Sequence, residues 1–345
     1  MPLISVLIPC HNSAPWLKEA VESICRQSHR HLEILVYDDG STDESPRILK
    51  QLAAADHRIA PMGSFPNRGI VHALNAMLHT AQGSFIARMD ADDISLPERL
   101  ALQLRHLETN ATDLCGTWYR DFGHGIGRSV HRPYAGEREV RAELLFQSAI
   151  GHPTLLARRE VFEKFQYRDD YIFAEDYDLF VRVSAQFRLA NIPKILYRYR
   201  RHRQQTTRTR RAAMEAVAGK IRIEALRARG IEPSTEEQRI HNLIRAPHSI
   251  HSLEELRQIE IWLLKLLERF ERPEEQRIIA AQWTRAAIRA APLGGKMWRM
   301  LRRSRLYALQ PNRPGNAVAL AFLAATRLDY DSQAFDILQR FSLGG

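Results

Sequence analysis

Short apolar runs alternate with amphipathic segments along the first 120 residues of the chain. Three runs rich in β-branched and aliphatic residues, Leu3–Ile8, Leu32–Tyr37 and Ser84–Met89, have the length of single buried strands. Four helical patterns lie between and after these runs. The first runs from a cap at Asn12 or Ser13 to about Gln27, with Pro15 in its first turn, and the second follows the capping box Ser41–Glu44. The third covers Ile70–Ala81, and the fourth covers Glu98–Glu108 after Pro97. This alternation predicts a parallel sheet that helices cover on both faces.

The pattern changes along the rest of the chain. Residues 113–200 mix both kinds of element, with strand-like runs at 114–119, 154–157 and 195–199 and a helix over 176–186. After residue 205 strand signals vanish, and the remaining segments have helical periodicity. Ser252–Glu255 forms a capping box before one amphipathic helix, and Pro273 begins another that ends before Pro292. We therefore expect an α/β domain over residues 1–205 and an all-α region over residues 206–345.

The charge of the chain divides along the same boundary. The formal net charge is +10, which favours a polyanionic partner. Residues 1–197 hold 22 Lys and Arg against 25 Asp and Glu, whereas residues 198–345 hold 28 against 15. The first part is therefore slightly acidic, at −3, and the basic excess of +13 belongs to the helical region.

The composition of the chain limits its structural class and its expected cellular compartment. A hydrophobic content of 45% supports a sizeable core and excludes a wholly disordered chain. Cys10, Cys25 and Cys115 are too few and too scattered for a disulfide framework or a CxxC zinc site. The N-terminus lacks the basic region of a signal peptide, and the longest apolar stretch, Ala317–Ala325, is far shorter than the roughly 20 residues that a bilayer requires. We expect a cytoplasmic protein of a reducing compartment.

Polar clusters follow the three predicted strands, at Pro9–Asn12, Asp38–Asp39 and Asp90–Asp93. In open parallel sheets ligands bind beyond the carboxyl ends of the strands, where these clusters lie. The carboxylates of Asp90–Asp93 suit a hard divalent cation, and an Asp at 38–39 suits hydrogen bonds from a base or ribose. The alternative is that both clusters only cap the helices that follow them.

Two further clusters lie in the second half of the α/β domain. Glu175–Asp178 opens a predicted helix, so its acids are either N-terminal caps or a general base that takes a proton from a hydroxyl. The basic segment Tyr197–Arg203 contains His202 and several arginines. These side chains suit phosphate binding, and His202 also suits a metal; the alternative is a solvated basic linker.

The order of these blocks resembles the family 2 glycosyltransferases, which have the GT-A nucleotide-diphospho-sugar fold, a Rossmann-like and mostly parallel sheet. The resemblance covers about residues 3–207. It rests on these blocks: Ser5–Asn12, Asp38–Asp43, Asn67–Gly69 with Asn75, Asp90–Asp93, Pro97–Leu100 with Gln103, Gly151–Thr154, Glu175–Asp178, and Tyr197–Arg198 with His202. His11 stands where an aromatic residue is common, and Phe180 replaces a frequent Trp; neither change affects the chemistry.

The resemblance implies an inverting, metal-dependent transfer of a sugar from a nucleotide diphosphate donor to a hydroxyl of a glycan or lipid-linked acceptor. Such reactions build cell-surface polysaccharide or lipopolysaccharide. It assigns the following roles: Asp39, Pro9, His11, Asn12 and Asn67 to the donor pocket; Asp90 to the ribose; Asp92 and His202 to Mn²⁺ or Mg²⁺; and Asp176 to the catalytic base. The metal and basic side chains then stabilise the leaving diphosphate in place of an acid.

Other readings of the chain remain open. The basic stretches 198–211 and 296–305 suit peripheral contact with an anionic membrane, and the alternative for the second is an ordinary packed surface helix. Nucleic acid is not expected as a partner, because no nucleic-acid-binding motif is present. A catalytically inactive sugar-nucleotide-binding scaffold is a second candidate function, which the retention of both Asp92 and Asp176 disfavours. A nucleotidyltransferase is a third, but no glycine-rich basic loop follows the first strand.

Overall fold

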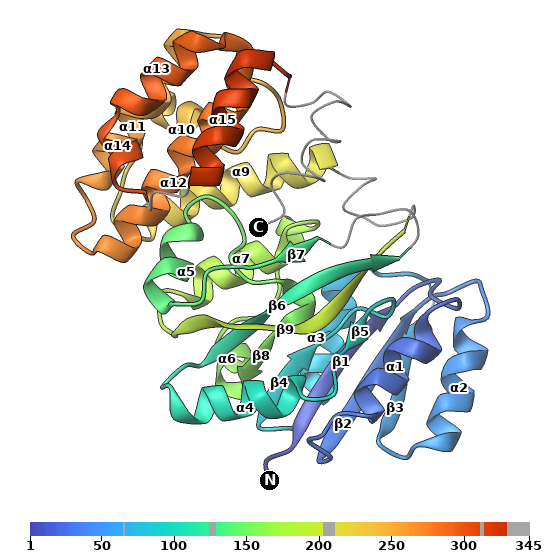
Figure 1. Cartoon of the computed structure of the whole chain (residues 1–345). Coiled ribbons are helices and arrows are strands. Elements are labelled where there is room, and N and C mark those ends of the chain that lie inside the picture. Colours follow the sequence, from blue (N-terminus) through green and yellow to red (C-terminus); the bar gives the residue numbers. More distant parts are fainter. Residues whose placement is uncertain (65, 124–128, 203–210, 311–313, 330–345) are drawn as a thin grey trace. The chain divides into compact units, whose positions relative to one another are not determined.

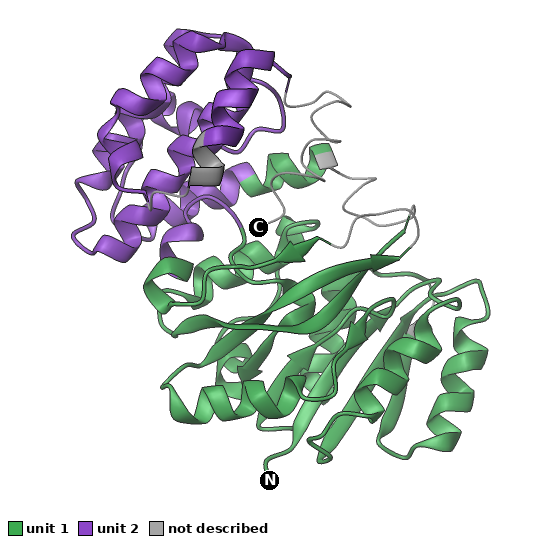
Figure 2. Ribbon diagram, viewed as in Figure 1, with its two compact units in different colours: residues 1–140, 148–218 green, residues 141–147, 219–345 purple. Residues whose placement is uncertain are grey.

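The computed structural model describes the chain except for Phe65 and residues 124–128, 203–210, 311–313 and 330–345 (Figure 1). Its contacts divide the chain into two compact units (Figure 2). The sheet unit contains residues 1–140 and 148–218, and the helical unit contains residues 141–147 and 219–345. The sequence placed one boundary near residue 205. The contacts place it near 218 and also assign the internal segment 141–147 to the helical unit.

One mixed sheet forms the framework of the sheet unit. Its strands, among the described residues, are β1 (Ile4–Cys10), β2 (Leu32–Asp39), β3 (Ile59–Ser64), β4 (Phe85–Arg88), β5 (Ile94–Ser95), β6 (Leu114–Gly123), β7 (Val130–His131), β8 (Leu156–Arg158) and β9 (Leu189–Arg201). The strand order is β3-β2-β1-β4-β8-β6-β9-β5, and β7 pairs with β6. The pairs among β1 to β4 are parallel, as is β6 with β9, whereas β8 runs antiparallel to both β4 and β6.

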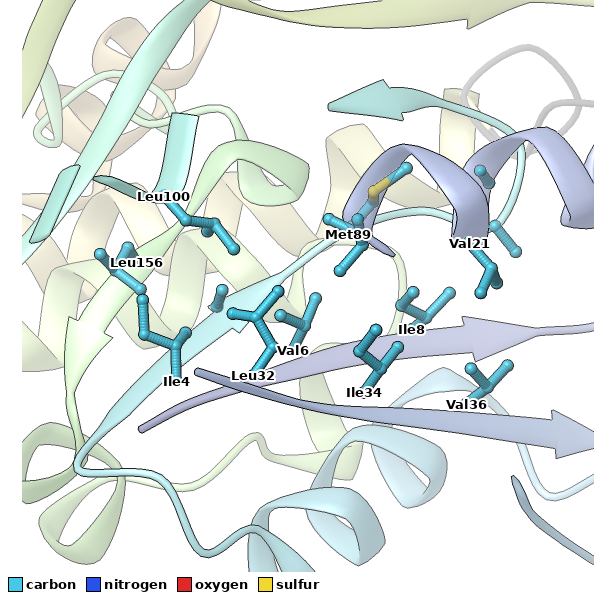
Figure 3. Close-up of a cluster of buried hydrophobic side chains, with 14 of the residues drawn as sticks. Ile4, Val6, Ile8, Val21, Leu32, Ile34, Val36, Met89, Leu100 and Leu156 are labelled. Atoms are coloured by element: carbon cyan, nitrogen blue, oxygen red, sulfur yellow. The ribbon is translucent and has the colours of Figure 1, made fainter. Parts of the chain in front are cut away.

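Helices cover the sheet on both faces, as the sequence predicts (Figure 1). They are α1 (Leu17–Cys25), α2 (Ser45–Ala55), α3 (Ile70–Thr80), α4 (Arg99–Thr109), α5 (Glu137–Glu143), α6 (Arg159–Lys164) and α7 (Glu175–Val183), with the short 3-10 helices η1 (His152–Thr154) and η2 (Asp169–Tyr171). Ile4, Val6 and Ile8 of β1 pack in one core cluster (Figure 3). Leu7, on the opposite face, is only 1% exposed. Burial of both strand faces is typical of a parallel sheet.

Three strand predictions differ from the structure. The sequence analysis missed β3, which contains Pro61 and Gly63 and therefore lacks a clear strand pattern. A proline is tolerated there because β3 lies at the edge of the sheet and only β2 pairs with it. The run predicted over 154–157 is shifted, since Thr154 ends η1 and β8 begins at Leu156. The run at 195–199 is the second half of the longer strand β9.

Two predicted helix caps are wrong. Helix α1 begins at Leu17 after Trp16 and α2 begins at Ser45 after Glu44, and neither preceding residue caps its helix through its side chain; Asp43 Oδ1 instead accepts the backbone N–H of Ser45 at 2.9 Å. The side chains that were expected to cap these helices connect two loops instead. Asn12 Oδ1 accepts the backbone N–H of Thr42 at 2.9 Å, and Ser41 Oγ accepts the backbone N–H of Asn12 at 2.9 Å. The loops after β1 and β2 are thereby tied together.

The helical unit contains only helices among its described residues, in agreement with the predicted all-α region. They are the second part of α9 (Arg211–Arg227), α10 (Thr235–Leu243), α11 (Leu253–Leu267), α12 (Pro273–Arg289), the 3-10 helix η3 (Ala291–Leu293), α13 (Gly295–Arg303), α14 (Arg305–Ala308) and α15 (Pro314–Thr326). Ser252 caps α11 and Pro273 opens α12, as predicted. Of the helices described, none combines the length and apolar character that crossing a bilayer requires.

Candidate active site

The ends of β1 and β2 bring the predicted donor-pocket residues together. Because the strands are parallel and Cys10 lies opposite Asp38, the residues after each strand meet at one edge of the sheet. The carbonyl oxygen of Asp39 accepts hydrogen bonds from His11 Nδ1 at 2.9 Å and from Asn67 Nδ2 at 2.8 Å. Asn12 Nδ2 donates to His11 Nε2 at 3.2 Å. Pro9, the remaining predicted residue, lies half-buried in β1.

The carboxylate of Asp39 holds a loop. Its side chain is almost fully buried, and its two oxygens accept the backbone N–H groups of Arg68 and Gly69, each at 2.8 Å. Gly69 has a φ of 89°, a conformation that favours glycine, and it precedes α3. Each carboxylate oxygen can accept a further hydrogen bond, so this anchoring role leaves acceptor capacity for a ligand.

Three acidic side chains gather on the turn after β4. Carboxylate oxygens of Asp90, Asp92 and Asp93 all lie within 4.8 Å of one another. Burial, followed by the charge of Asp90, raises the pKa of Asp92, and burial raises the pKa of Asp93 well above its usual range. The negative charges of clustered carboxylates repel one another. A hard divalent cation that binds their oxygens removes this repulsion, so the cluster is suited to such an ion.

Strand β9 brings His202 to this acidic turn. The short strand β5, which follows the turn, pairs antiparallel with β9, so that Ile94 lies opposite Arg198. His202 Nε2 consequently lies 2.8 Å from Asp92 Oδ2, across 110 positions of sequence. The ring of Trp16 stacks on His202 with a centroid distance of 4.2 Å. The structure therefore joins the two residues that the sequence assigned to a metal.

The first turn of α7 carries the acid pair Glu175 and Asp176. Burial, with the charge of Asp176 as the second cause, raises the pKa of Glu175 to about 7. Burial also raises the pKa of Asp176, against the backbone N–H of Tyr177, the charge of Arg88 and the hydroxyl of Ser148. Ser148 Oγ donates to Asp176 Oδ2 at 3.2 Å. Asp176 is therefore a largely buried carboxylate whose ionised form is stabilised by these polar and charged neighbours.

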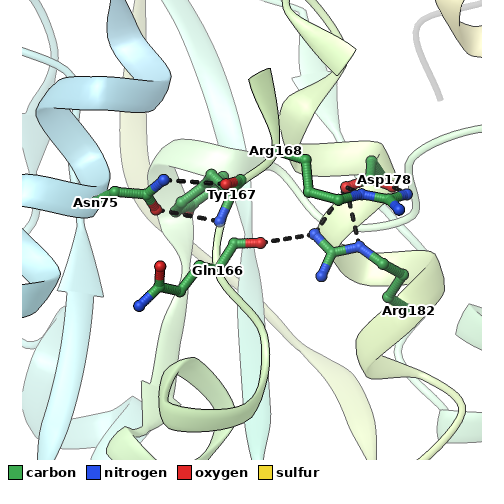
Figure 4. A network of polar contacts seen from close by, with 6 residues as sticks. All are labelled: Asn75, Gln166, Tyr167, Arg168, Asp178 and Arg182. Carbon is green, nitrogen blue, oxygen red and sulfur yellow. Dashed lines mark hydrogen bonds and ion pairs between the residues drawn. The ribbon is translucent and has the colours of Figure 1, made fainter. Parts of the chain in front are cut away.

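Asp178, in the same motif, has a different role. Its side chain is 1% exposed and forms ion pairs with Arg168 and with Arg182, the latter at 2.7 Å (Figure 4). Arg182 Nη2 also donates to the carbonyl oxygen of Gln166 at 2.8 Å. These contacts anchor the segment before α7, and they distinguish Asp178, a structural residue, from Asp176.

A second anchor fixes the same segment from α3. The side-chain amide of Asn75 forms two hydrogen bonds with the backbone of Tyr167, at 3.0 and 3.1 Å (Figure 4). The residue before the helix, Ala174, follows Phe173, whose φ of 77° is unusual for an aromatic residue. Backbone strain of this kind persists only where surrounding contacts impose it, and it concentrates at functional sites.

Sequence reasoning missed Arg88 and Ser148. Arg88 is buried at the end of β4, and its Nη2 lies 2.6 Å from Asp90 Oδ1. Its charge also lowers the pKa of Asp176, so one buried cation acts on both acidic groups. The signal in the sequence was a lone arginine inside an apolar strand, Phe85–Met89. Ser148 carried no such signal.

The basic segment after β9 is partly neutralised by neighbouring acids. Arg200 pairs with Glu19 at 2.5 Å, and Arg201 pairs with Asp121 at 2.9 Å. The backbone N–H of Arg200 donates to Asp93 Oδ1 at 2.6 Å. Arg200 therefore braces the acidic turn. Most of the predicted phosphate- and membrane-binding stretch 198–211 lies outside the described residues.

Comparison with known sequences identifies the family. The sequence model of "Glycosyl transferase family 2" matches residues 5–166. An uncharacterised glycosyltransferase of Haemophilus influenzae is 30% identical over 238 residues, which cover 65% of this chain and 73% of that protein. The O-antigen biosynthesis glycosyltransferase WbnJ of Escherichia coli is 28% identical over 226 residues, or 64% of this chain and 89% of WbnJ.

Solved structures agree on the fold. Residues 1–349 of S. aureus TarS, in complex with UDP-GlcNAc, superpose with a TM-score of 0.56 at 17% identity, covering 93% of this chain and 91% of that one. The mannosyltransferase PcManGT of Pyrobaculum calidifontis, in complex with GDP-Man and Mn²⁺, gives 0.50 at 16% identity, covering 94% and 86%. At these identities the likeness concerns the fold alone. Together with the sequence relatives, the GT-A sheet and its acidic turn identify the chain as a member of glycosyltransferase family 2.

Proposed function

We propose that the sheet unit transfers a sugar, with inversion, from a nucleotide diphosphate donor to an acceptor hydroxyl in a metal-dependent reaction. The observation that carries this proposal is the meeting of Asp92 with His202 beside Asp90 and Asp93. A donor with a diphosphate needs a cation and an ordered pocket, and a base must face the acceptor. The sheet unit provides groups suited to each task.

The donor pocket is assigned to the loops after β1 and β2. His11, Asn12 and Asn67 are held by hydrogen bonds around Asp39, so their positions are set before a nucleotide arrives. Preorganised groups bind a ligand with less loss of conformational entropy. Asp39 is assigned to the nucleotide base, these three residues and Pro9 are assigned to the same pocket, and Asp90 is assigned to the ribose. Two solved structures of similar fold are complexes with UDP-GlcNAc and with GDP-Man and Mn²⁺, which supports a nucleotide sugar as donor.

Asp92 and His202 are the residues assigned to hold Mn²⁺ or Mg²⁺. The donor set fits such an ion, because it combines carboxylate oxygens with an imidazole nitrogen. When bound, the cation supplies neutralisation of the charge that develops on the departing diphosphate. Arg200 and Trp16 hold the acidic turn and His202 in place from two sides.

Asp176 is assigned as the general base. It takes the proton from the acceptor hydroxyl while that oxygen bonds to the anomeric carbon, and the bond from this carbon to the diphosphate breaks on the opposite face. A single displacement of this kind inverts the anomeric centre. Glu175 has a pKa of about 7 and is therefore partly protonated at neutral pH, so the adjacent pair does not carry two full charges.

A thermal-shift screen of nucleotide sugars with Mn²⁺ tests the donor assignment. We expect one donor, at about one hundred times its dissociation constant, to raise the melting temperature by about 5 °C, because a ligand that binds only the folded state stabilises it. Addition of EDTA removes the increase and abolishes transfer. Uniform responses to all nucleotide sugars, or activity that a chelator does not affect, contradict the proposed function.

We also propose that the acceptor is a glycan or a lipid-linked glycan of the cell surface. The named relative WbnJ acts in O-antigen biosynthesis, which supports this class of acceptor. A lipid-linked acceptor places the enzyme at a membrane, and the helical unit has a surface suited to one. Four basic side chains of α13 are exposed: Lys296, Arg299, Arg302 and Arg303. None of the four forms an ion pair within the described parts of the chain.

The apolar side of α13 does not face outward. Met297 and Leu301 are fully buried in the helical unit, so on this helix we propose membrane contact only for the basic side and for the half-buried Trp298. Apolar contact is available on α15, which packs against α13. There Val318 is 70% exposed and Phe322, one turn later, is 48% exposed. Exposed apolar side chains beside a basic helix are typical of peripheral membrane contact.

Vesicle flotation tests this membrane contact. We expect binding to vesicles that contain anionic lipid, little binding to zwitterionic vesicles, and loss of binding at high salt. The double substitution Arg299→Glu with Arg302→Glu weakens binding at least about thirtyfold, at about 1 kcal/mol for each basic residue lost. Arg257→Glu with Arg277→Glu, on α11 and α12, makes the same change in charge elsewhere and is the control. Equal recovery on both kinds of vesicle contradicts the contact.

A further inference from the structure

The segment 141–147 leaves the sheet unit and is built into the helical unit. Glu143 is buried there, and its Oε1 lies 2.7 Å from Arg285 Nη1 of α12. Gln282, also on α12, donates to Glu143 Oε2 at 3.1 Å. A buried carboxylate is costly unless it is paired and hydrogen-bonded, so these contacts fix the position of the segment firmly.

Two other helices, α9 and α10, and the turn after α10 hold the residues that follow Glu143. Arg222 Nε of α9 donates to the carbonyl oxygen of Phe146 at 2.9 Å. His241 Nε2 of α10 bonds the carbonyl oxygen of Leu145 at 2.8 Å, and its ring packs on Phe146. Arg245, just after α10, donates to the side chain of Gln147. The helical unit thus forms polar contacts with both the backbone and the side chains of this short segment.

The next residue along the chain is Ser148, in the sheet unit. Its hydroxyl lies 3.2 Å from Asp176 Oδ2 and 3.2 Å from the carbonyl oxygen of Ile150. A hydroxyl has one proton, so it cannot donate fully to both acceptors at once. A small displacement of Ser148 therefore changes the strength of the hydrogen bond that its hydroxyl donates to Asp176.

We propose that Ser148 is a positioning residue for the catalytic carboxylate Asp176, and that the helical unit sets its place through the segment 141–147. The inference rests on the proposed function, because it takes Asp176 as the base. It gives the helical unit a part in the reaction that is separate from membrane contact. Helices α9, α10 and α12 fix the position of the segment 141–147, and the covalent chain transmits this position to the adjoining Ser148.

Asp176 has several charged or titratable neighbours besides Ser148. Burial and then the charge of Asp176 raise the pKa of Glu175, while a backbone hydrogen bond and the charge of Arg88 oppose the effect of burial on the pKa of Asp176. Burial chiefly raises the pKa values of Tyr119 and Tyr167, and the charge of Asp176 raises them further. The hydroxyl of Ser148 stabilises the ionised form of Asp176 and opposes the effect of burial.

Because a general base acts only when ionised, activity rises with pH through the pKa of Asp176. Loss of the hydroxyl raises the pKa and moves the acid limb of the pH profile upward.

The first test is Ser148→Ala in the full-length enzyme, with kcat/KM measured against pH. We expect the acid limb to move upward by about one pH unit, which is about a tenfold loss on that limb, with the donor KM close to wild type. Ser148→Thr keeps the hydroxyl and restores the profile. Ser184→Ala, which removes a hydroxyl at the other end of α7, is the matched control and leaves the profile unchanged.

The second test is Arg285→Gln, which loosens the segment without touching Asp176. We expect the acid limb to shift in the same direction, whereas Arg277→Gln, at an exposed position of the same helix, leaves it in place. If Arg285→Gln does not yield folded protein, the half-buried Arg245→Met replaces it. Lower thermal stability with an unchanged pH profile would show that these contacts are only structural, and it would overturn the role of the helical unit.

The proposed base and the positioning role of Ser148 are contradicted by different outcomes. Full activity of Asp176→Asn removes the proposed base and, with it, the positioning role of Ser148, while sugar transfer itself stands. The proposed function fails if the wild-type enzyme transfers sugar from none of the nucleotide sugars. An inactive Asp176→Asn combined with an unchanged pH profile of Ser148→Ala leaves the base in place and overturns only the positioning role. A shifted profile in Ser148→Ala but not in Arg285→Gln limits the effect to the serine and excludes control by the helical unit.

Discussion

Replacement of Asp176 by asparagine is expected to reduce sugar transfer by about 10²- to 10⁴-fold, the usual contribution of a general base. The amide has nearly the same size as the carboxylate and can still accept the hydrogen bond of Ser148 Oγ. It cannot take a proton from the acceptor hydroxyl. Donor binding, measured by the thermal shift with Mn²⁺, is expected to stay near that of the wild type, because the assigned donor pocket lies at the ends of β1, β2 and β4.

The matched control for this variant is Asp170→Asn. Asp170 is an exposed acid on η2, a few residues before α7, and the same change there is expected to leave transfer intact. Retention of more than a tenth of the activity by Asp176→Asn would exclude this residue as the base. The same pair of variants also separates an enzyme from a sugar-nucleotide-binding scaffold, since a scaffold performs no reaction that Asp176→Asn can abolish.

Replacement of Asp92 by asparagine is expected to abolish the stabilisation that a nucleotide sugar provides in the presence of Mn²⁺. Even outer partners of metal ligands commonly contribute 10- to 100-fold to metal affinity, so the loss of a direct ligand is expected to cost at least about 100-fold. An amide oxygen lacks the full negative charge that attracts the cation. Transfer falls with metal occupancy, and a titration of activity against Mn²⁺ measures the shift.

Asp113→Asn is the control for this prediction. Asp113 is a half-buried acid that contacts Arg158 and the backbone N–H of Arg188 just before β6, so it matches Asp92 in burial but belongs to no acidic cluster. The substitution is expected to leave the Mn²⁺ titration unchanged. An Asp92→Asn enzyme with the Mn²⁺ dependence of the wild type would remove this residue from the metal site, whatever its remaining activity.

Local pattern predicted most of the sheet unit and of its candidate site. The apolar runs of β1, β2 and β4 have the length of single buried strands, and polar clusters follow them directly in the chain. Parallel strands place such clusters at one edge by geometry alone, so the meeting of the loops after β1 and β2 followed from the sequence. The pairing of Asp92 with His202 was available only through the family resemblance, since no local rule relates residues 110 positions apart.

Other features had no local signal. Pro61 concealed an edge strand, and the side chains of Asn12 and Ser41 joined two loops instead of capping the helices that follow. Asp176 and Asp178 are equivalent by pattern. Only the folded chain shows that Asp178 pairs with two arginines, whereas the side-chain hydrogen bond of Asp176 comes from the hydroxyl of Ser148.

The sequence by itself determined the fold class, the family and the set of chemical groups at the strand ends, because periodicity and short motifs are local properties of the chain. The tertiary structure decided which of those groups meet and which unit each segment joins. The ion pair of Glu143 with Arg285, and with it the place of the segment 141–147 in the helical unit, depends on contacts between residues far apart in sequence. Such contacts are fixed by the burial and pairing of charges, which a linear pattern does not encode.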